Sequence, residues 1–179
     1  MNSVAIGRPG PDEYPQFFAD YVARVAEADV LPALHDQVDI VEAAFASVPV
    51  SAEGHRYAAE KWNVRQIAGH LIDAERVLGY RALCFARGES QSLPGFDEDE
   101  YVRHAPFESI PLADLVREWR YLRESHVLMF RGLASDAWHR VGTANGSRVT
   151  VRAMAYVLVG HVRHHLAIFE ERYRASLPR

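Results

Sequence analysis

Length, composition and charge limit what this chain can be. It has 179 residues, of which 49% are hydrophobic and 25% charged, and a net charge of -4 with histidine neutral. This length suffices for a single domain with a core of its own. The slightly acidic balance argues against a nucleic-acid partner, because such a partner calls for a basic face.

Two features concern the compartment. Residues 1–10 contain no basic segment followed by a long apolar run, and no apolar run reaches the roughly 18 residues of a membrane span. We therefore expect neither a signal peptide nor contact with a membrane. Cys84 is the single cysteine, so no internal disulfide is expected, which favours the cytoplasm.

The first part of the chain, residues 1–28, is predicted to be an arm that ends in a short helix. Pro9, Pro11 and Pro15 favour an extended backbone, and the aromatic residues between Tyr14 and Glu27 favour a short helix that packs on the rest of the domain. Residues 29–179 are predicted to form the main domain.

Four longer segments of that domain place apolar residues three and four positions apart, the pattern of helices in a bundle. They begin near residues 29, 63, 111 and 150. Asn63 with Gln66 forms a capping-box pair at the second start, and Thr150 caps the fourth. The sequence thus predicts an all-α four-helix bundle.

The connections differ in character. Asn145-Gly146 predicts a small hairpin or tight turn before the last helix. Residues 89–110 are predicted to form a long loop, either a solvated crossover or a cover over a functional site.

Histidines supply the candidate chemistry. His161 and His165 are four residues apart, so a helix places both imidazoles on one face, where they can bind one metal ion. His70 lies on the apolar face of the second helix and is the candidate third ligand. Three imidazoles leave a fourth position open, as in catalytic zinc sites. Three neutral imidazoles do not select the metal, because they suit zinc, nickel, iron or copper alike. We expect zinc or nickel first, with iron, manganese or copper as alternatives.

Other residues near this site allow both a functional and a structural interpretation. Asp73, one turn after His70, is a candidate to orient an imidazole or act as a base, but it also fits an ordinary surface position. His126 lies on the apolar face of the third helix, where a hydrogen bond to a carboxylate would satisfy it equally well. His164 is expected at the rim, because its position points away from the pair.

Two segments resemble a known family. Residues 62–75, WNVRQIAGHLIDAE, and 160–165, GHVRHH, resemble the histidine segments of DinB-like (DinB/YfiT) proteins. Residues 94–99 and 142–146 resemble a subgroup of that family. The resemblance implies a bundle of up-down-down-up topology and a divalent metal held by His70, His161 and His165.

The same resemblance implies an activity without fixing it. Some family members are thiol S-transferases that use bacillithiol or mycothiol, others are considered metal-dependent hydrolases, and homodimers are frequent. We therefore expect a metal-dependent enzyme that activates water or a low-molecular-weight thiol against a small-molecule substrate. The mouth of its pocket would be lined by residues 89–110 and the N-terminal arm. The alternative is a non-enzymatic stress-response or binding protein with a structural metal and a dimerisation surface.

Overall fold

The computed structural model describes residues 6–177 and is mostly helical, as the sequence predicts. The long helices are α2 (Val30–Ala46), α3 (Val64–Ala86), α5 (Leu112–Arg131) and α6 (Val151–Ile168). The shorter elements are α1 (Ala19–Ala23), α4 (Glu98–His104), the strands β1 (Val141–Ala144) and β2 (Ser147–Thr150), a π-helical turn (Phe169–Tyr173), and 3₁₀ turns at Gln16–Phe18, Val50–Ala52, Phe107–Ser109, Ser135–His139 and Arg174–Ser176. None of the helices within 6–177 is long and apolar enough to cross a bilayer.

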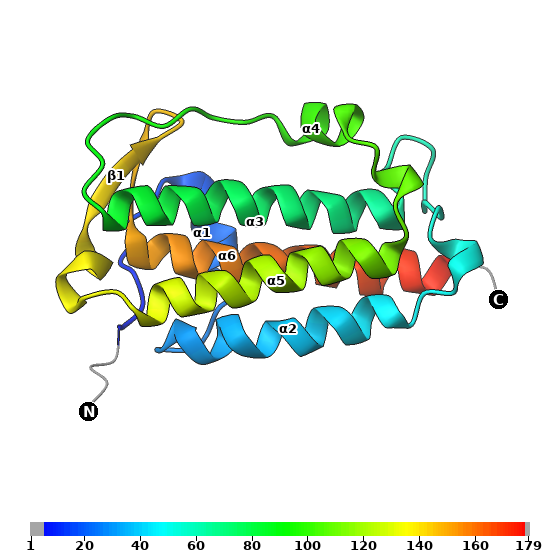
Figure 1. The fold of residues 1–179 in the computed structure, drawn as a ribbon, viewed down its shortest axis with the longest axis horizontal. Helices are drawn as coiled ribbons and strands as arrows, with labels where there is room; N and C mark the ends of the chain where they lie inside the picture. The colour runs from blue at the N-terminus through cyan, green and yellow to red at the C-terminus, as the bar shows by residue number, and fades with distance from the viewer. Residues whose placement is uncertain (1–5, 178–179) are drawn as a thin grey trace.

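The four long helices lie side by side (Figure 1). Helix α3 packs against α5 and α6, and α2 packs against the same two helices. Helices α2 and α6 run in one direction and α3 and α5 in the other, so the connection between α3 and α5 returns along the length of the bundle (Figure 1). The α3–α6 pair is antiparallel, and it carries the site described below.

Local sequence signals explain the helix starts. The Asn63 side chain accepts a hydrogen bond from the Gln66 amide, and the Gln66 side chain accepts one from the Asn63 amide, each at 2.9 Å. Thr150 Oγ1 accepts from the Ala153 amide at 3.1 Å. In the hairpin, Asn145 and Gly146 both adopt positive φ, 50° and 70°, as a tight two-residue turn requires.

Two expected elements differ from those observed. The 89–110 segment is not entirely a loop, because it contains α4, whose start is capped by the Asp97 side chain accepting from the Glu100 amide. Acidic residues in the first turn of α4 also stabilise the N-terminus of this helix. In the sequence alone, the same acidic run is equally typical of a solvent-exposed loop. The helix expected between Tyr14 and Glu27 is shorter, Ala19–Ala23.

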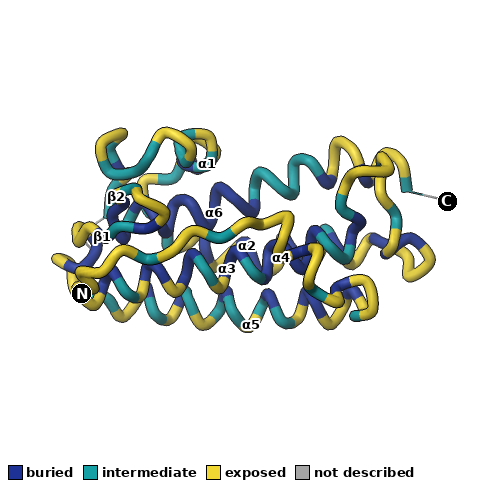
Figure 2. Tube along the Cα trace, turned by 90° about the horizontal axis from the view of Figure 1, so that it is seen from above, coloured by how far each residue is buried: buried dark blue, intermediate teal, exposed yellow. Residues whose placement is uncertain are grey.

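The core consists of two hydrophobic clusters, one toward each end of the bundle. Each long helix carries a buried polar group at or next to the boundary between the two clusters: Gln37 on α2, Glu75 on α3, Arg123 on α5 and His161 on α6. Helix α6 is buried through its first two-thirds and becomes half-buried after Val162, a change visible along the tube in Figure 2. The histidine site lies where that change occurs.

Candidate metal centre

His70 is positioned by the start of its own helix. The capping box at Asn63 fixes where α3 begins, and His70 follows two turns later on the face toward α6. Trp62, just before the cap, lies against the His70 imidazole with ring centroids 4.7 Å apart. The same local signal that starts the helix thus also supplies one wall of the site.

His161 and His165 are positioned by polar contacts to the backbone of α6. Gln37 donates to the carbonyl of Val159 at 2.8 Å, and Arg123 donates to that of Leu158 at 3.3 Å. Arg123 in turn forms two hydrogen bonds to Glu75, at 2.9 and 2.7 Å. Because these groups are buried and paired, they hold the turn of α6 directly before the first of the two histidines.

The three imidazoles converge through their Nε2 atoms. His70 Nε2 lies 3.0 Å from His161 Nε2 and 3.1 Å from His165 Nε2. All three donor atoms lie within 4.8 Å of one another. A tetrahedral ion with bonds of about 2.0 Å holds its ligand atoms about 3.3 Å apart, so the spacing fits one ion.

Hydrogen bonds between the imidazoles explain this arrangement less well than a shared metal ion does. A neutral imidazole has one N–H donor and one acceptor nitrogen, so His70 Nε2 has either a proton or a lone pair to offer, but two neighbours to satisfy. A shared cation satisfies all three lone pairs at once. The donor set therefore fits a divalent ion.

The electrostatics favour the metal-binding protonation state. Burial lowers the pKa of His70 to about 4 and that of His165 to about 2, and it lowers the pKa of His161 well below its usual value. For His161 and His165 the neighbouring imidazoles add to this effect. All three rings are consequently neutral at pH 7, and a neutral imidazole is the form that binds metal ions.

Aromatic residues complete the surroundings. The Tyr21 ring makes edge-on contacts with His161 and His164, at centroid distances of 5.4 and 5.5 Å. Trp62 covers the other side, with its ring stacked toward His165 at 6.4 Å. Neither Trp62 nor Tyr21 was assigned to the site from the sequence, because periodicity does not reveal which aromatic residue reaches a distant helix.

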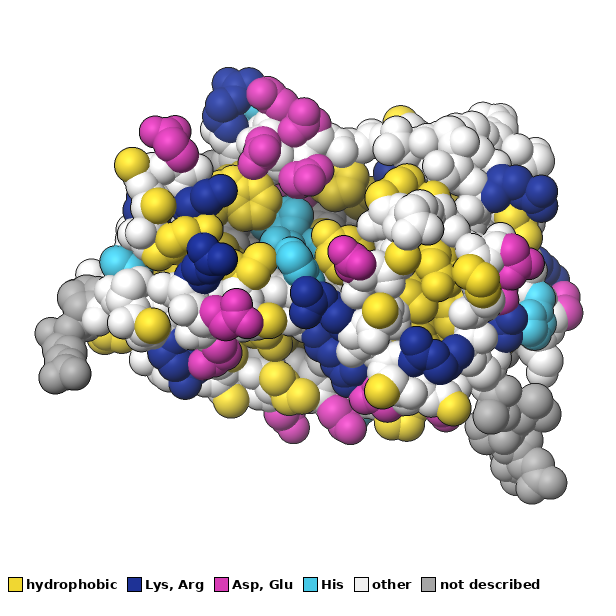
Figure 3. Space-filling model, turned by 180° about the vertical axis from the view of Figure 1, so that it is seen from behind, with side chains coloured by type: hydrophobic (Ala, Val, Ile, Leu, Met, Phe, Trp, Pro, Cys, Tyr) yellow, Lys and Arg dark blue, Asp and Glu magenta, His cyan; other side chains and the backbone are white. Residues whose placement is uncertain are grey.

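The site opens into a cavity of about 450 Å³, a size typical of small-molecule sites. Figure 3 shows histidine side chains at the floor of a hollow, with hydrophobic side chains around it and acidic ones along one side. Residues from both segments expected at the mouth line the cavity: Pro15, Phe17, Phe18 and Tyr21 from the N-terminal segment, and Phe96 and Glu98 from 89–110.

The remaining candidates fall outside the three-histidine cluster. His126 Nδ1 lies 2.8 Å from the Glu75 carboxylate, the contact expected from the sequence if His126 is not a metal ligand. His164 lines the cavity but contributes no atom to the cluster. Asp73 is not among the described residues of the cavity wall; it lies about 60° around α3 from His70, and its electrostatic neighbours are Arg76 and Glu118. Half-burial raises the pKa of this carboxyl.

Residues 33–169 match the model of the DinB superfamily, and the chain belongs to that superfamily. No curated protein matches the sequence.

Two solved structures share the fold. YfiT from Bacillus subtilis, described as a probable metal-dependent hydrolase with an unusual four-helix bundle topology, has a TM-score of 0.76 at 17% identity, over 96% of this chain and 98% of YfiT. A mycothiol-dependent maleylpyruvate isomerase has a TM-score of 0.64 at 15% identity, over 77% of this chain; the chain spans 58% of the isomerase.

Proposed function

We propose that this protein is a metal-dependent enzyme in which His70, His161 and His165 hold one divalent ion, zinc or nickel. The convergence of the three Nε2 atoms within 4.8 Å, at the floor of a cavity, is the observation that carries the proposal. When bound, such an ion lowers the pKa of a water or thiol and polarises a carbonyl oxygen.

The chain's own residues serve that chemistry by position. The neutral imidazoles supply lone pairs without first losing protons at pH 7. Trp62 and Tyr21 cover two sides of the cluster and limit the approach of bulk water, which strengthens the electrostatic interactions inside. The cavity gives a small molecule room beside the cluster.

The comparisons support the class of activity rather than the reaction. One structural neighbour is described as a probable metal-dependent hydrolase and the other as a mycothiol-dependent isomerase, so both water and a low-molecular-weight thiol are candidate nucleophiles. The helix directions in Figure 1 support the up-down-down-up topology that the family resemblance implies. Homodimerisation and a cytoplasmic location stay predictions.

The non-enzymatic alternative is less well supported. A purely structural metal site is closed by four protein ligands, whereas only three ligand residues gather here among residues 6–177 and their cluster faces a cavity.

Activity on zinc- and nickel-loaded protein tests the proposal. The substrates would be a panel of esters and amides for hydrolysis, and monobromobimane with several low-molecular-weight thiols for conjugation. We expect turnover with at least one pair, loss of that turnover in His161→Ala, and retention in His35→Ala, which alters an exposed histidine of α2. Fully metal-loaded protein that turns over nothing in either panel would favour the binding-protein alternative.

A further inference from the structure

Arg81 is a buried cation without a carboxylate partner. Two arginines of the described chain are buried, Arg123 at 0% exposed and Arg81 at 6%. Arg123 is neutralised by Glu75 through two hydrogen bonds. No carboxylate among residues 6–177 lies within ion-pair distance of Arg81, which instead donates one hydrogen bond to the Pro94 carbonyl at 2.7 Å.

That single hydrogen bond does not account for the charge. A guanidinium has five N–H donors, and a carbonyl oxygen accepts from one of them without neutralising the group. An unpaired buried charge is costly, and burial lowers the pKa of Arg81. An anion that entered the cavity beside Arg81 would recover this cost.

Arg81 lines the same cavity as the three histidines, at its other end. Both His70 and Arg81 lie on α3, eleven residues and thus about 16 Å apart along one face of the helix. Helix α6 runs antiparallel and repeats the layout: Met154 lies eleven residues before His165, and both line the cavity. The cavity therefore follows the seam between the two helices.

The stretch between the ends is apolar. Ala74 and Leu78 from α3 and Val157 from α6 line it. At the Arg81 end, backbone hydrogen bonds hold the chain beside Pro94 in place. The Leu93 amide donates to the Thr143 carbonyl at 2.9 Å, and the Leu93 carbonyl accepts from the Asn145 amide at 3.0 Å. The Phe96 ring lies 5.8 Å from the Arg81 guanidinium.

We propose that Arg81 recognises a carboxylate at the far end of an elongated substrate or thiol whose reacting group lies at the three-histidine cluster. This inference rests on the proposed function for its reacting end. The ligand has an apolar middle and spans at most about 16 Å, since the two ends of the cavity lie about three helical turns apart. A planar carboxylate matches the guanidinium fork.

A single negative charge fits better than a phosphate dianion. Arg81 is the only cation other than histidine in the described lining, and Glu98 is the one carboxylate. Glu98 acts on the Tyr21 phenol, whose pKa is raised by burial and then by this charge. Arg81 thus neutralises one negative charge of a ligand at its end of the cavity, and the second charge of a dianion would stay unpaired.

Binding to metal-free protein tests Arg81 by itself. Calorimetry would compare octanoate with octan-1-ol on the wild type, Arg81→Met, Arg81→Lys and Arg76→Met. Arg76 is the matched control, because it lies on α3 outside the cavity and pairs with Glu118. We expect the wild type to prefer octanoate by about tenfold or more, Arg81→Met to lose this preference with octanol binding unchanged, and Arg81→Lys and Arg76→Met to keep it. An equal preference in the wild type and Arg81→Met would overturn the proposal.

A second measurement needs no variant. Cobalt-loaded wild type would be titrated with ω-mercaptocarboxylates and ω-mercaptoalcohols of increasing length, following the thiolate-to-cobalt absorption. We expect the carboxylates to bind better only when the chain is long enough to span the cavity. A preference independent of length would contradict the proposed span. If the protein binds no cobalt, the proposed function fails, whereas the octanoate comparison still decides the role of Arg81.

Discussion

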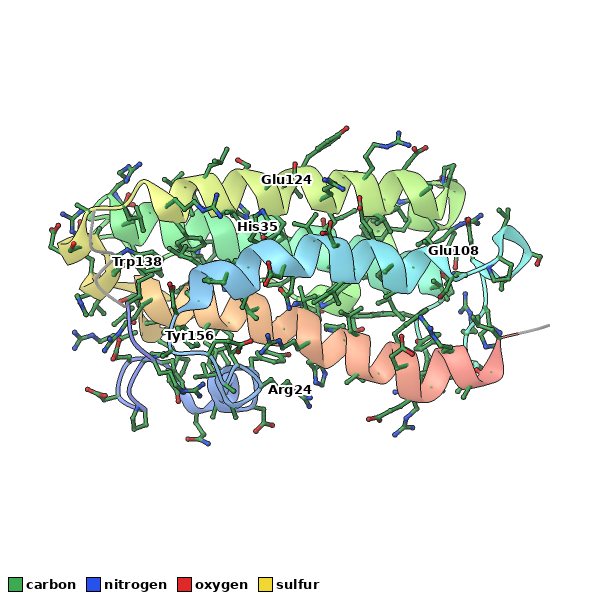
Figure 4. All side chains as sticks on the ribbon, turned by 90° about the horizontal axis from the view of Figure 1, so that it is seen from below. Arg24, His35, Glu108, Glu124, Trp138 and Tyr156 are labelled. Carbon is green, nitrogen blue, oxygen red and sulfur yellow. The ribbon has the colours of Figure 1, made fainter. Side chains whose placement is uncertain are left out.

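The carbonyl of Tyr21 packs so closely against Gly160 that no β-carbon fits at position 160. This contact brings α1 onto α6 one residue before His161 and places the Tyr21 ring against the histidines. Figure 4 shows the N-terminal segment with Arg24 beside α6, and Tyr156 nearby, whose hydroxyl donates to the carbonyls of Glu27 and Ala28.

Gly160→Ala should therefore detach α1 from α6. We expect a loss of stability of about 1–3 kcal/mol, the usual cost of overpacking, together with weaker metal binding, because Tyr21 moves away from His161. Urea unfolding and a metal titration measure the two effects. Gly54→Ala is the control, since a β-carbon at Gly54 meets nothing within 4 Å. Equal stability of the two variants would show that the contact does not constrain the fold.

The buried pair of Arg123 and Glu75 should matter more than any surface pair. Arg123→Met leaves the Glu75 charge buried with His126 alone, so we expect a loss of about 3–5 kcal/mol. Arg76→Met, which breaks an exposed pair, should cost less than about 1 kcal/mol. In urea unfolding, adding Glu75→Gln to Arg123→Met should cost less than the sum of the two single changes. Additive losses would mean that the two side chains do not act as a pair.

Trp62 should report directly on metal binding. Its ring lies 4.7 Å from the His70 ring, so Co²⁺ bound at the cluster should quench its fluorescence. We expect quenching that saturates at one equivalent in the wild type and is mostly absent in Trp62→Phe, although that variant binds cobalt. Quenching of equal size in both proteins would place the ion away from this tryptophan.

The ion pair of Glu27 and Arg163 should contribute a pH-dependent stability. The hydrogen bonds from Arg163 lower the pKa of Glu27 to about 2 from its ordinary 4.5. Because the folded-state pKa is the lower one, the contribution is complete above about pH 4.5 and disappears as the pH falls toward 2.

Glu27→Gln should accordingly reduce stability at pH 7 by less than about 1 kcal/mol, since the pair is partly exposed. The difference from the wild type should shrink between pH 4.5 and 3 in urea unfolding. Glu60→Gln, at an exposed position without an ion pair among the described residues, should show no difference at any pH. A Glu27→Gln effect that does not change with pH would exclude the lowered pKa as its cause.

Much of the fold was predictable because its signals are local. Asn63 with Gln66 and Thr150 mark helix starts through contacts within one turn, and Asn145-Gly146 marks a turn through its own backbone preference. Helix α4 was missed because its acidic first turn has the same composition as a solvated loop.

The three-histidine cluster was predictable from the sequence, but the walls of the cavity were not. His70, His161 and His165 follow from helical spacing on two helices, and spacing also excludes His164. Tyr21 and Arg81 could not be assigned, because the first reaches the site through the contact at Gly160 and the second is distinguished by a missing partner. The role of Asp73 stays a prediction, because its side chain is not among the described residues that line the cavity.

The most direct test of the three-histidine site is metal content after equilibrium dialysis against Zn²⁺, with Co²⁺ absorption to report the geometry. We predict one ion per chain for the wild type, with the intense visible bands of tetrahedral cobalt, and the same for His164→Ala. His70→Ala, His161→Ala and His165→Ala should each lose the ion or bind it far more weakly, while staying folded. A metal-free wild type, or equal binding by His165→Ala and His164→Ala, would contradict the assignment.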